Sequence, residues 1–382
     1  MKIEEIKKLL PKVIEHRREL HKIPELGLDL PKTVAYVERY LKDLGFFPKR
    51  LGKGIICDIG NPPFVAIRAD MDALPMEEKN DLPYKSTHPG RMHACGHDAH
   101  TAVLLGLAEY LYKNSPPIGV RLIFQAGEEG YFGAVEMIKA GALENVELIL
   151  GQHVGNQAEA PEGGIITKKG VFMASADAFD VKFKGKGGHG SAPHEARDPI
   201  SPAAQFVTSV YSFRSREINQ THPFVTTITK LVSGTTFNVI PDTAEIAGTV
   251  RTISEEDRKK AARRLEEIAK GVAEANDIEF EFVYHWMYRT LVNTDWVVDM
   301  LVEAASKIGI PVIQLDTPIM GGEDFSYYLE RVPGVFFFTN TANLEKGIVQ
   351  PNHSPYFNID EEKLWVPMAV FVKMVEEYAS KK

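Results

Sequence analysis

Three short apolar segments in the first half of the chain each run into ionisable residues, and this pattern constrains the fold most strongly. The segments 64–67, 120–124 and 148–150 lead respectively to Asp70 and Asp72, to Glu128 and Glu129, and to His153. Helical spacing at 3–21, 31–44, 99–113 and 133–140 alternates with these segments. Alternation of this kind predicts an α/β fold, with a central sheet flanked by helices. Ligands in such sheets gather at the carboxyl ends of the strands, so we expect these side chains at one rim.

Residues 92–100 hold three histidines, an aspartate and one of the two cysteines of the chain, just before an apolar helical run. Thiolate, imidazole and carboxylate groups bind transition metals, and we expect the helix N-terminus to favour a deprotonated Cys95. The alternative is a polar helix start capped by Asp98, with the histidines on the surface. Cysteine has no capping advantage, so the segment favours a metal site.

Composition indicates two globular domains, because the chain has 382 residues, of which 44% are hydrophobic and 25% charged. A net charge of −8 argues against nucleic acid or an anionic membrane as a partner. Residues 1–20 lack a continuous apolar signal core, and we therefore expect a cytoplasmic protein. Cys57 lies in the string Gly-Ile-Ile-Cys-Asp-Ile and is predicted to be a buried strand residue. A single disulfide between the two cysteines is not expected, because disulfides are uncommon in the cytosol.

The middle of the chain follows a different order, β-α-β-β-α-β. Its expected elements are strands at 178–183, 223–231, 244–250 and 278–283 and helices at 199–216 and 255–276. This order is typical of a ferredoxin-like domain. We therefore expect a discontinuous catalytic, metal-binding domain, 1–175 and 288–382, with an inserted lid and dimerisation domain at 176–287. A four-stranded sheet leaves an edge strand that a second copy can cover, which predicts a homodimer or higher homo-oligomer through this domain.

Six strings, in order along nearly the whole chain, carry a resemblance to a known family. They are RELHKIPELG at 18–27, IRADMDALP at 67–75, MHACGHDAH at 92–100, GEEG at 127–130, MGGEDF at 320–325 and NHSP at 352–355. With them the chain resembles the aminoacylase/carboxypeptidase family of two-metal peptidases. It is most similar to the amidohydrolase branch, which contains aminoacylases, hippurate hydrolases, auxin-conjugate hydrolases, N-acetyldiaminopimelate deacetylases and some carboxypeptidases.

The resemblance implies a metallopeptidase-type catalytic domain with two divalent metals per subunit. Its metal ligands would be Cys95, His97, Glu129, His153 and His353. Glu128 would be the general base, and Asp72 would orient a metal-ligating histidine. Asp70 stands where other branches have a histidine ligand, so the bridging ligand is left open. His353 by itself, between Asn and Ser-Pro, would be typical of a turn.

The resemblance also implies roles for the inserted domain. His189 would polarise the scissile carbonyl, in relatives often from the partner subunit. Asn238 and Arg251 would bind the carboxylate end of the substrate, and Gly322 is a further substrate-binding position. Arginine suits this role because its planar fork can hold a carboxylate through two hydrogen bonds. From the residues alone, His189, Asn238 and Arg251 each fit a structural turn or strand end equally well.

Together these features predict metal-dependent hydrolysis of the amide bond of N-acyl-L-amino acids. A metallocarboxypeptidase that acts on short or N-blocked peptides is the first alternative, and an N-acetyldiaminopimelate deacetylase is the second. One thiolate and several imidazoles favour Zn²⁺, while the carboxylate leaves room for Mn²⁺, Co²⁺ or Ni²⁺. One further hypothesis is a non-catalytic metal-binding protein, in which some of the catalytic residues would be expected to be replaced. Another is that Cys95 acts as a covalent nucleophile.

Overall fold

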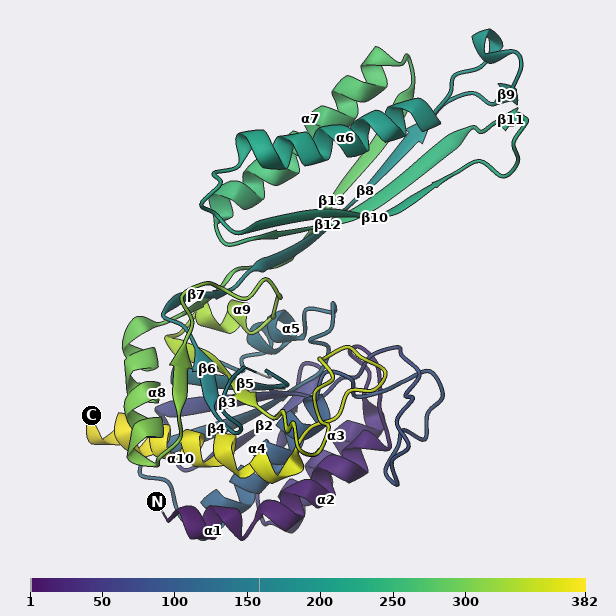
Figure 1. The fold of residues 1–382 in the computed structure, drawn as a ribbon. Coiled ribbons are helices and arrows are strands. Elements are labelled where there is room, and N and C mark those ends of the chain that lie inside the picture. The colour runs from purple at the N-terminus through teal and green to yellow at the C-terminus, as the bar shows by residue number, and fades with distance from the viewer. Residues whose placement is uncertain (1, 158) are drawn as a thin grey trace. The chain divides into compact units, whose positions relative to one another are not determined.

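The computed structural model describes residues 2–157 and 159–382, which divide into two units (Figure 1). The first unit comprises Met1–Gly170, Val292–Asp316 and Asp324–Lys382, and the second comprises Val171–Leu291 and Thr317–Glu323. The segment Thr317–Glu323, expected in the catalytic domain, thus groups with the inserted residues. Within the described ranges, no helix combines the length and apolarity that a bilayer crossing needs.

The first unit is built on an eight-stranded mixed sheet in the order β1-β2-β4-β3-β5-β16-β6-β15. Its strands are β1 (Lys49–Leu51), β2 (Gly54–Ile59), β3 (Phe64–Asp70), β4 (Gly119–Gln125), β5 (Val146–Gly155), β6 (Ile165–Thr167), β15 (Val312–Gln314) and β16 (Gly334–Asn340). The central strands β4, β3, β5 and β16 are parallel. Every residue of β3, β4 and β16 is buried, as expected for strands covered on both faces. The predicted α/β fold is confirmed, and Cys57 is buried in β2.

The helices of the first unit pack against this sheet or against one another (Figure 1). They are α1 (Ile3–Lys7), α2 (Leu10–His21), α3 (Pro31–Asp43), α4 (His97–Lys113), α5 (Gly133–Lys139), α8 (Asp295–Lys307), α9 (Ser326–Leu329) and α10 (Trp365–Ser380), with a 3₁₀ turn at Glu361–Lys363. The single helix expected at 3–21 is wrong, because the chain forms α1 and α2 instead. Pro11 lies in the first turn of α2, where its missing N–H is tolerated, and it cannot continue a preceding helix. Helix α4 packs on β3, β4 and β5 and is the most deeply buried helix of the unit.

The second unit has the predicted β-α-β-β-α-β order (Figure 1). Its main elements are β8 (Ser175–Lys184), α6 (Ile200–Glu217), β10 (Phe224–Ser233), β12 (Thr243–Thr252), α7 (Glu255–Ala275) and β13 (Glu279–Tyr288). The four strands form an antiparallel sheet in the order β10-β12-β8-β13. Every second residue of β12 is buried, which fits a sheet with one face packed on helices.

Short elements complete the second unit and the segments that connect the two units. Strands β9 (Gly188–His189) and β11 (Val239–Ile240) form a two-stranded ribbon that the sequence pattern does not indicate. A 3₁₀ turn at Pro193–Glu195 follows β9 along the chain. Strands β7 (Gly170–Met173) and β14 (Leu291–Asn293) lie where the chain enters and leaves the inserted residues.

A buried ion pair links α7 to β8 and gives a first testable prediction. Nε and Nη2 of Arg258 each donate to a carboxylate oxygen of Asp177 at 2.7 Å. We expect Arg258→Met to lower the free energy of unfolding by about 3–5 kcal/mol, because it leaves a buried carboxylate without its cation. Chemical denaturation of the full chain measures this loss. The control Arg263→Met changes an exposed arginine of the same helix, paired with Glu267, and should cost at most about 0.5 kcal/mol. Equal losses in the two variants would contradict the prediction.

Candidate metal centre

The carboxyl ends of three neighbouring parallel strands place ionisable residues at one edge of the sheet. Asp70 is the last residue of β3, and Glu128 lies in the turn that follows β4. His153 lies within β5, which continues to Gly155, rather than after the strand as the sequence suggested. Helix α4 begins at His97, directly after Gly96 in the left-handed conformation with a φ of 92°.

The structure brings the five predicted ligand residues together in two groups. One group is Cys95, His97 and His153, and the other is Cys95, Glu129 and His353. In each group the possible ligand atoms lie within 4.8 Å of one another. The Sγ atom of Cys95 lies 3.3 Å from Nε2 of His153 and 3.3 Å from Nε2 of His353. Cys95 therefore occupies a shared position between the two groups.

The environment of Cys95 contradicts the expectation of an acidic thiol. Burial, together with the carboxylates of Glu129 and Glu128, raises the pKa of the Cys95 thiol well above its usual range. These effects outweigh the influence of the helix N-terminus. A bound cation would deprotonate such a thiol, whereas a thiol with a raised pKa is a poor nucleophile at neutral pH. The chemistry of Cys95 therefore fits a ligand better than a covalent nucleophile.

His97 is fully buried, and its two ring nitrogens make no hydrogen bond within residues 2–157 and 159–382. Its Nδ1 lies 3.5 Å from Oδ1 of Asp72, and its Nε2 lies 3.7 Å from Oδ2 of Asp70. Although burial opposes protonation, the carboxylates of Asp70 and Asp72 raise the pKa of His97 to about 10. Buried polar atoms without partners are uncommon and require an explanation. A divalent cation fits this donor set, because it would supply a partner for the imidazole and offset the nearby negative charge.

Asp72 also holds the turn that carries the two predicted acidic residues. Its Oδ1 accepts the backbone N–H of Glu128 at 2.9 Å, and its Oδ2 accepts that of Glu129 at 3.0 Å. The sequence predicted that Asp72 orients a histidine; the structure adds this support of the turn.

The loop that carries His353 is attached to the cluster through its backbone and its neighbour. His353 has a φ of 66°, which is uncommon for a residue other than glycine, and its N–H donates to the carbonyl of Ala94 at 2.8 Å. The Nδ2 group of Asn352 donates to the carbonyl oxygens of Cys95 at 3.0 Å and of Val154 at 3.2 Å. Sequence reasoning gave Asn352 no role, although it lies in the NHSP string beside His353.

The predicted site residues of the inserted unit form one close pair and two separate positions. His189 pairs with Val239 across the β9–β11 ribbon, and the N–H of Gly190 donates to the carbonyl of Asn238 at 2.9 Å. The Nδ1 atom of His189 accepts from Oγ of Ser191 at 2.8 Å. Within the described residues, no hydrogen bond joins Arg251 to His189 or Asn238.

Arg251 and Gly322 are each fixed by local structure. Nη1 of the half-buried Arg251 donates to the carbonyl of Asp177 at 3.2 Å and to that of Val250 at 3.1 Å. A Cβ atom on Gly322 would lie 2.6 Å from the Cβ of Ala176, so the position has no room for a side chain. Close packing therefore explains this glycine, and its predicted contact with substrate stays a prediction.

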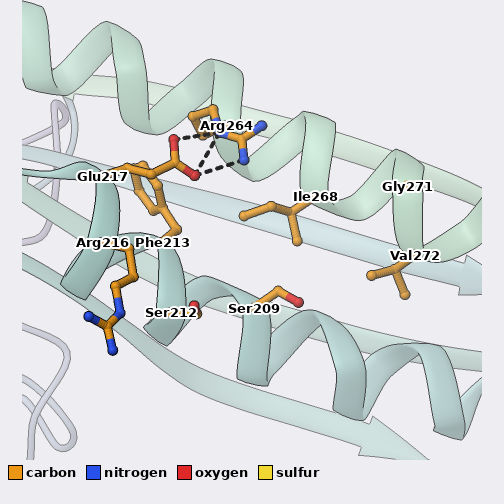
Figure 2. Close-up of a pocket in the computed structure, with 9 residues that line it drawn as sticks. All are labelled: Ser209, Ser212, Phe213, Arg216, Glu217, Arg264, Ile268, Gly271 and Val272. Atoms are coloured by element: carbon orange, nitrogen blue, oxygen red, sulfur yellow. Dashed lines mark hydrogen bonds and ion pairs between the residues drawn. The ribbon is translucent and has the colours of Figure 1, made fainter.

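A separate groove of about 340 Å³ lies between α6 and α7 (Figure 2). It is lined by Ser209, Ser212, Phe213, Arg216, Glu217, Arg264, Ile268, Gly271 and Val272. Figure 2 shows Arg264 facing Glu217, to which its Nη2 donates at 2.8 Å. Among the residues that the structure describes, no predicted site residue lines this groove, so the groove does not support the predicted chemistry.

Comparison with known proteins shows which family the chain belongs to. Residues 66–377 match the family model of Peptidase family M20/M25/M40. The chain belongs to this family. Thermostable carboxypeptidase 1 of Saccharolobus solfataricus is 40% identical over 380 residues, which cover 97% of this chain and 96% of that protein. N-acyl-L-amino acid amidohydrolase of Geobacillus stearothermophilus is 40% identical over 304 residues, which cover 76% of this chain and 82% of that protein.

A solved structure of the M20 family shows the same fold. The YXEP protein of Bacillus subtilis, described as a dinuclear metal binding peptidase, aligns with a TM-score of 0.82 at 33% identity, covering 98% of this chain and 100% of that chain. Membership of the family and the names of these relatives make the chain a hydrolytic enzyme. The predicted family and enzyme class are confirmed.

Proposed function

We propose that this chain hydrolyses the amide bond of N-acyl-L-amino acids at a centre of two divalent cations. Cys95, His97 and His153 would hold one cation, and Cys95, Glu129 and His353 would hold the other. The observation that carries the proposal is the pair of ligand groups that share Cys95. The description of the Bacillus subtilis relative as dinuclear supports two cations, and the name of the Geobacillus relative supports N-acyl amino acids.

The chain supplies the acid–base chemistry of the reaction. Bound cations would polarise the amide carbonyl and lower the pKa of the attacking water, which are the two main obstacles to amide hydrolysis. Glu128 would take a proton from the attacking water and return it to the leaving amine. Its carboxylate is buried and lies 4.0 Å from Nε2 of His97, and possible ligand atoms of Glu128, His97 and Glu129 lie within 4.8 Å of one another, so Glu128 is close to one residue of each ligand group. Asp72 holds the backbone of Glu128 in this position.

Ligand softness supports Zn²⁺ as the cation in the proposal. One thiolate and three imidazoles suit Zn²⁺, whereas the Glu129 carboxylate is also compatible with Mn²⁺, Co²⁺ and Ni²⁺.

The proposal also gives roles in substrate binding to predicted site residues of the inserted unit. In this proposal His189 polarises the scissile carbonyl, and Asn238 and Arg251 hold the carboxylate of the amino acid, with Gly322 beside it. Support comes from the β9–β11 ribbon, in which His189 pairs with Val239, the residue that follows Asn238, and from the fixed guanidinium of Arg251. Strands β10 and β13 are the edges of the inserted sheet, and pairing one of them with a second copy would give the predicted homo-oligomer. The cytoplasmic location stays a prediction.

A metallocarboxypeptidase that acts on short or N-blocked peptides is the second candidate function. The name of the Saccharolobus solfataricus relative favours it, and it would use the same cations and the same carboxylate anchor. An N-acetyldiaminopimelate deacetylase is a third candidate that differs only in the amine product.

Metal removal and a substrate panel test the proposal together. We expect protein stripped by a chelator to be inactive, and Zn²⁺, Mn²⁺, Co²⁺ or Ni²⁺ to restore the release of free amino acid. The substrates are N-acetyl and N-benzoyl amino acids, N-acetyldiaminopimelate and N-blocked dipeptides, each assayed by the free amine that is released. Faster cleavage of the blocked dipeptides would favour the carboxypeptidase. Folded protein that cleaves none of them with any metal would contradict the proposed hydrolysis.

A further inference from the structure

His100 is a buried histidine of α4 that the predicted ligand set does not include. It lies one turn after His97 on the same face of the helix, and its ring centroid is 4.6 Å from that of His153. Its Nδ1 lies 2.6 Å from Oδ1 of Asp70, and its Nε2 accepts the backbone N–H of Val154 at 2.9 Å. Both ring nitrogens therefore have partners.

These two contacts determine where the proton of the ring lies. Because the N–H of Val154 points at Nε2, that nitrogen carries the lone pair, and the proton of the neutral ring is on Nδ1. Nδ1 then donates to the carboxylate of Asp70. A ring with both nitrogens engaged has no lone pair left for a cation, which distinguishes His100 from the neighbouring His97 and His153.

The backbone of Val154 connects His100 to the predicted ligand His153. Its N–H donates to His100, and its carbonyl lies 2.7 Å from Nδ1 of His153. Because Nδ1 of His153 donates its proton to that carbonyl, Nε2 of the same ring carries a lone pair and faces Sγ of Cys95 at 3.3 Å. Val154 of β5 thus makes both connecting hydrogen bonds. Its carbonyl accepts the hydrogen bond that orients His153, and its N–H donates the hydrogen bond to His100 of α4.

Asp70 is held firmly by its other contacts. Nη1 of the buried Arg68 donates to its Oδ2 at 2.7 Å, and Oγ1 of Thr101 donates to its backbone carbonyl at 2.8 Å. The same guanidinium donates to Oδ1 of Asp324 through Nη2 at 2.7 Å. The carboxylate that faces His100 is therefore part of a buried network of hydrogen bonds.

We propose that His100, held by Asp70, is a positioning residue that sets the ring of His153 through the backbone of Val154. The inference rests on the proposed metal centre and assigns a role there to two residues outside its ligand set. Outer partners of metal-ligating histidines fix the tautomer and the orientation of the ring, and their loss typically weakens metal binding about 10- to 100-fold.

Titration of the chelator-stripped full chain with Co²⁺ tests this role by calorimetry and by the visible absorption of the bound ion. For His100→Phe we expect two equivalents bound, one with wild-type affinity and one about 10- to 100-fold weaker with an altered spectrum. His100→Gln should lose less, because its Oε1 can reach the position of Nε2 and accept the Val154 N–H. The control His16→Phe removes a buried histidine of α2 that contacts Tyr36, and should leave both Co²⁺ affinities unchanged.

The outcomes separate this inference from the proposed function. Folded His100→Phe that binds both equivalents with wild-type affinity overturns the positioning role alone. Loss of one full equivalent in both His100 variants also overturns it, because His100 would then be a ligand. Wild-type protein that binds no Co²⁺ overturns the proposed centre and the inference with it. Should His100→Phe fail to fold, Asp70→Asn decides: one weakened equivalent supports the role, and two unchanged ones overturn it.

Discussion

Glu128→Gln is expected to lower kcat by about 10²- to 10⁴-fold and to leave cation binding nearly unchanged, because the amide keeps the size of the side chain but cannot accept a proton. A loss of this size corresponds to about 2.7–5.4 kcal/mol of transition-state stabilisation. The five predicted ligands are not altered, and the N–H of residue 128 still donates to Asp72. Steady-state kinetics with an N-acyl amino acid, together with metal analysis of the purified variant, measure the two effects separately.

A matched control is Glu136→Gln, which changes a carboxylate of α5 that pairs with Lys139 on the surface. We expect it to keep wild-type kcat and KM. If Glu128→Gln kept full turnover, another group would have to be the base. If it lost the cations as well as activity, Glu128 would be a ligand rather than a base.

Much of the fold could be predicted because apolar residues recur along the sequence at the spacing of the helix or strand that each segment forms. The inserted β-α-β-β-α-β unit follows from alternating strands and amphipathic helices, and its elements lie within a few residues of the predicted ones. The break between α1 and α2 was missed because apolar periodicity continues across it, and only Pro11 indicates the interruption. The β9–β11 ribbon was missed because each strand has two residues, too few to show a period.

The site shows a similar limit. The motif strings of the family resemblance predicted that residues far apart in the chain, such as Cys95 and His353, lie together, and Nε2 of His353 is 3.3 Å from Sγ of Cys95. The roles of Val154 and Asn352 could not be predicted, because they depend on hydrogen bonds to backbone carbonyls, and the type of a residue does not indicate where its carbonyl points. The pKa of Cys95 was predicted in the wrong direction because the helix start is visible in sequence, whereas burial and the facing carboxylates are not.

Cys95→Ser should have the largest effect on metal binding, because the Cys95 side chain is the one that both ligand groups contain. A serine hydroxyl is neutral at pH 7 and a much weaker ligand than a thiolate, so we expect both cations to bind more weakly. The loss should exceed the roughly 10- to 100-fold effect of an outer partner. His353→Ala, in contrast, should weaken only one equivalent, since His353 belongs to one group. Calorimetric titration of the stripped proteins with Zn²⁺ distinguishes the two patterns.

Cys57→Ser is the matched control, since it replaces the other cysteine of the chain, which is buried in β2 away from the ligand groups. We expect it to lower stability and to keep two equivalents of Zn²⁺. The Cys95 result also decides between two chemistries for the thiol. An inactive Cys95→Ser that retained both cations at wild-type affinity would make Cys95 a nucleophile and overturn its role as a shared ligand. If the Cys95 thiolate is the shared ligand, as its contacts with a histidine of each group imply, Cys95→Ser should lose cation binding and activity together.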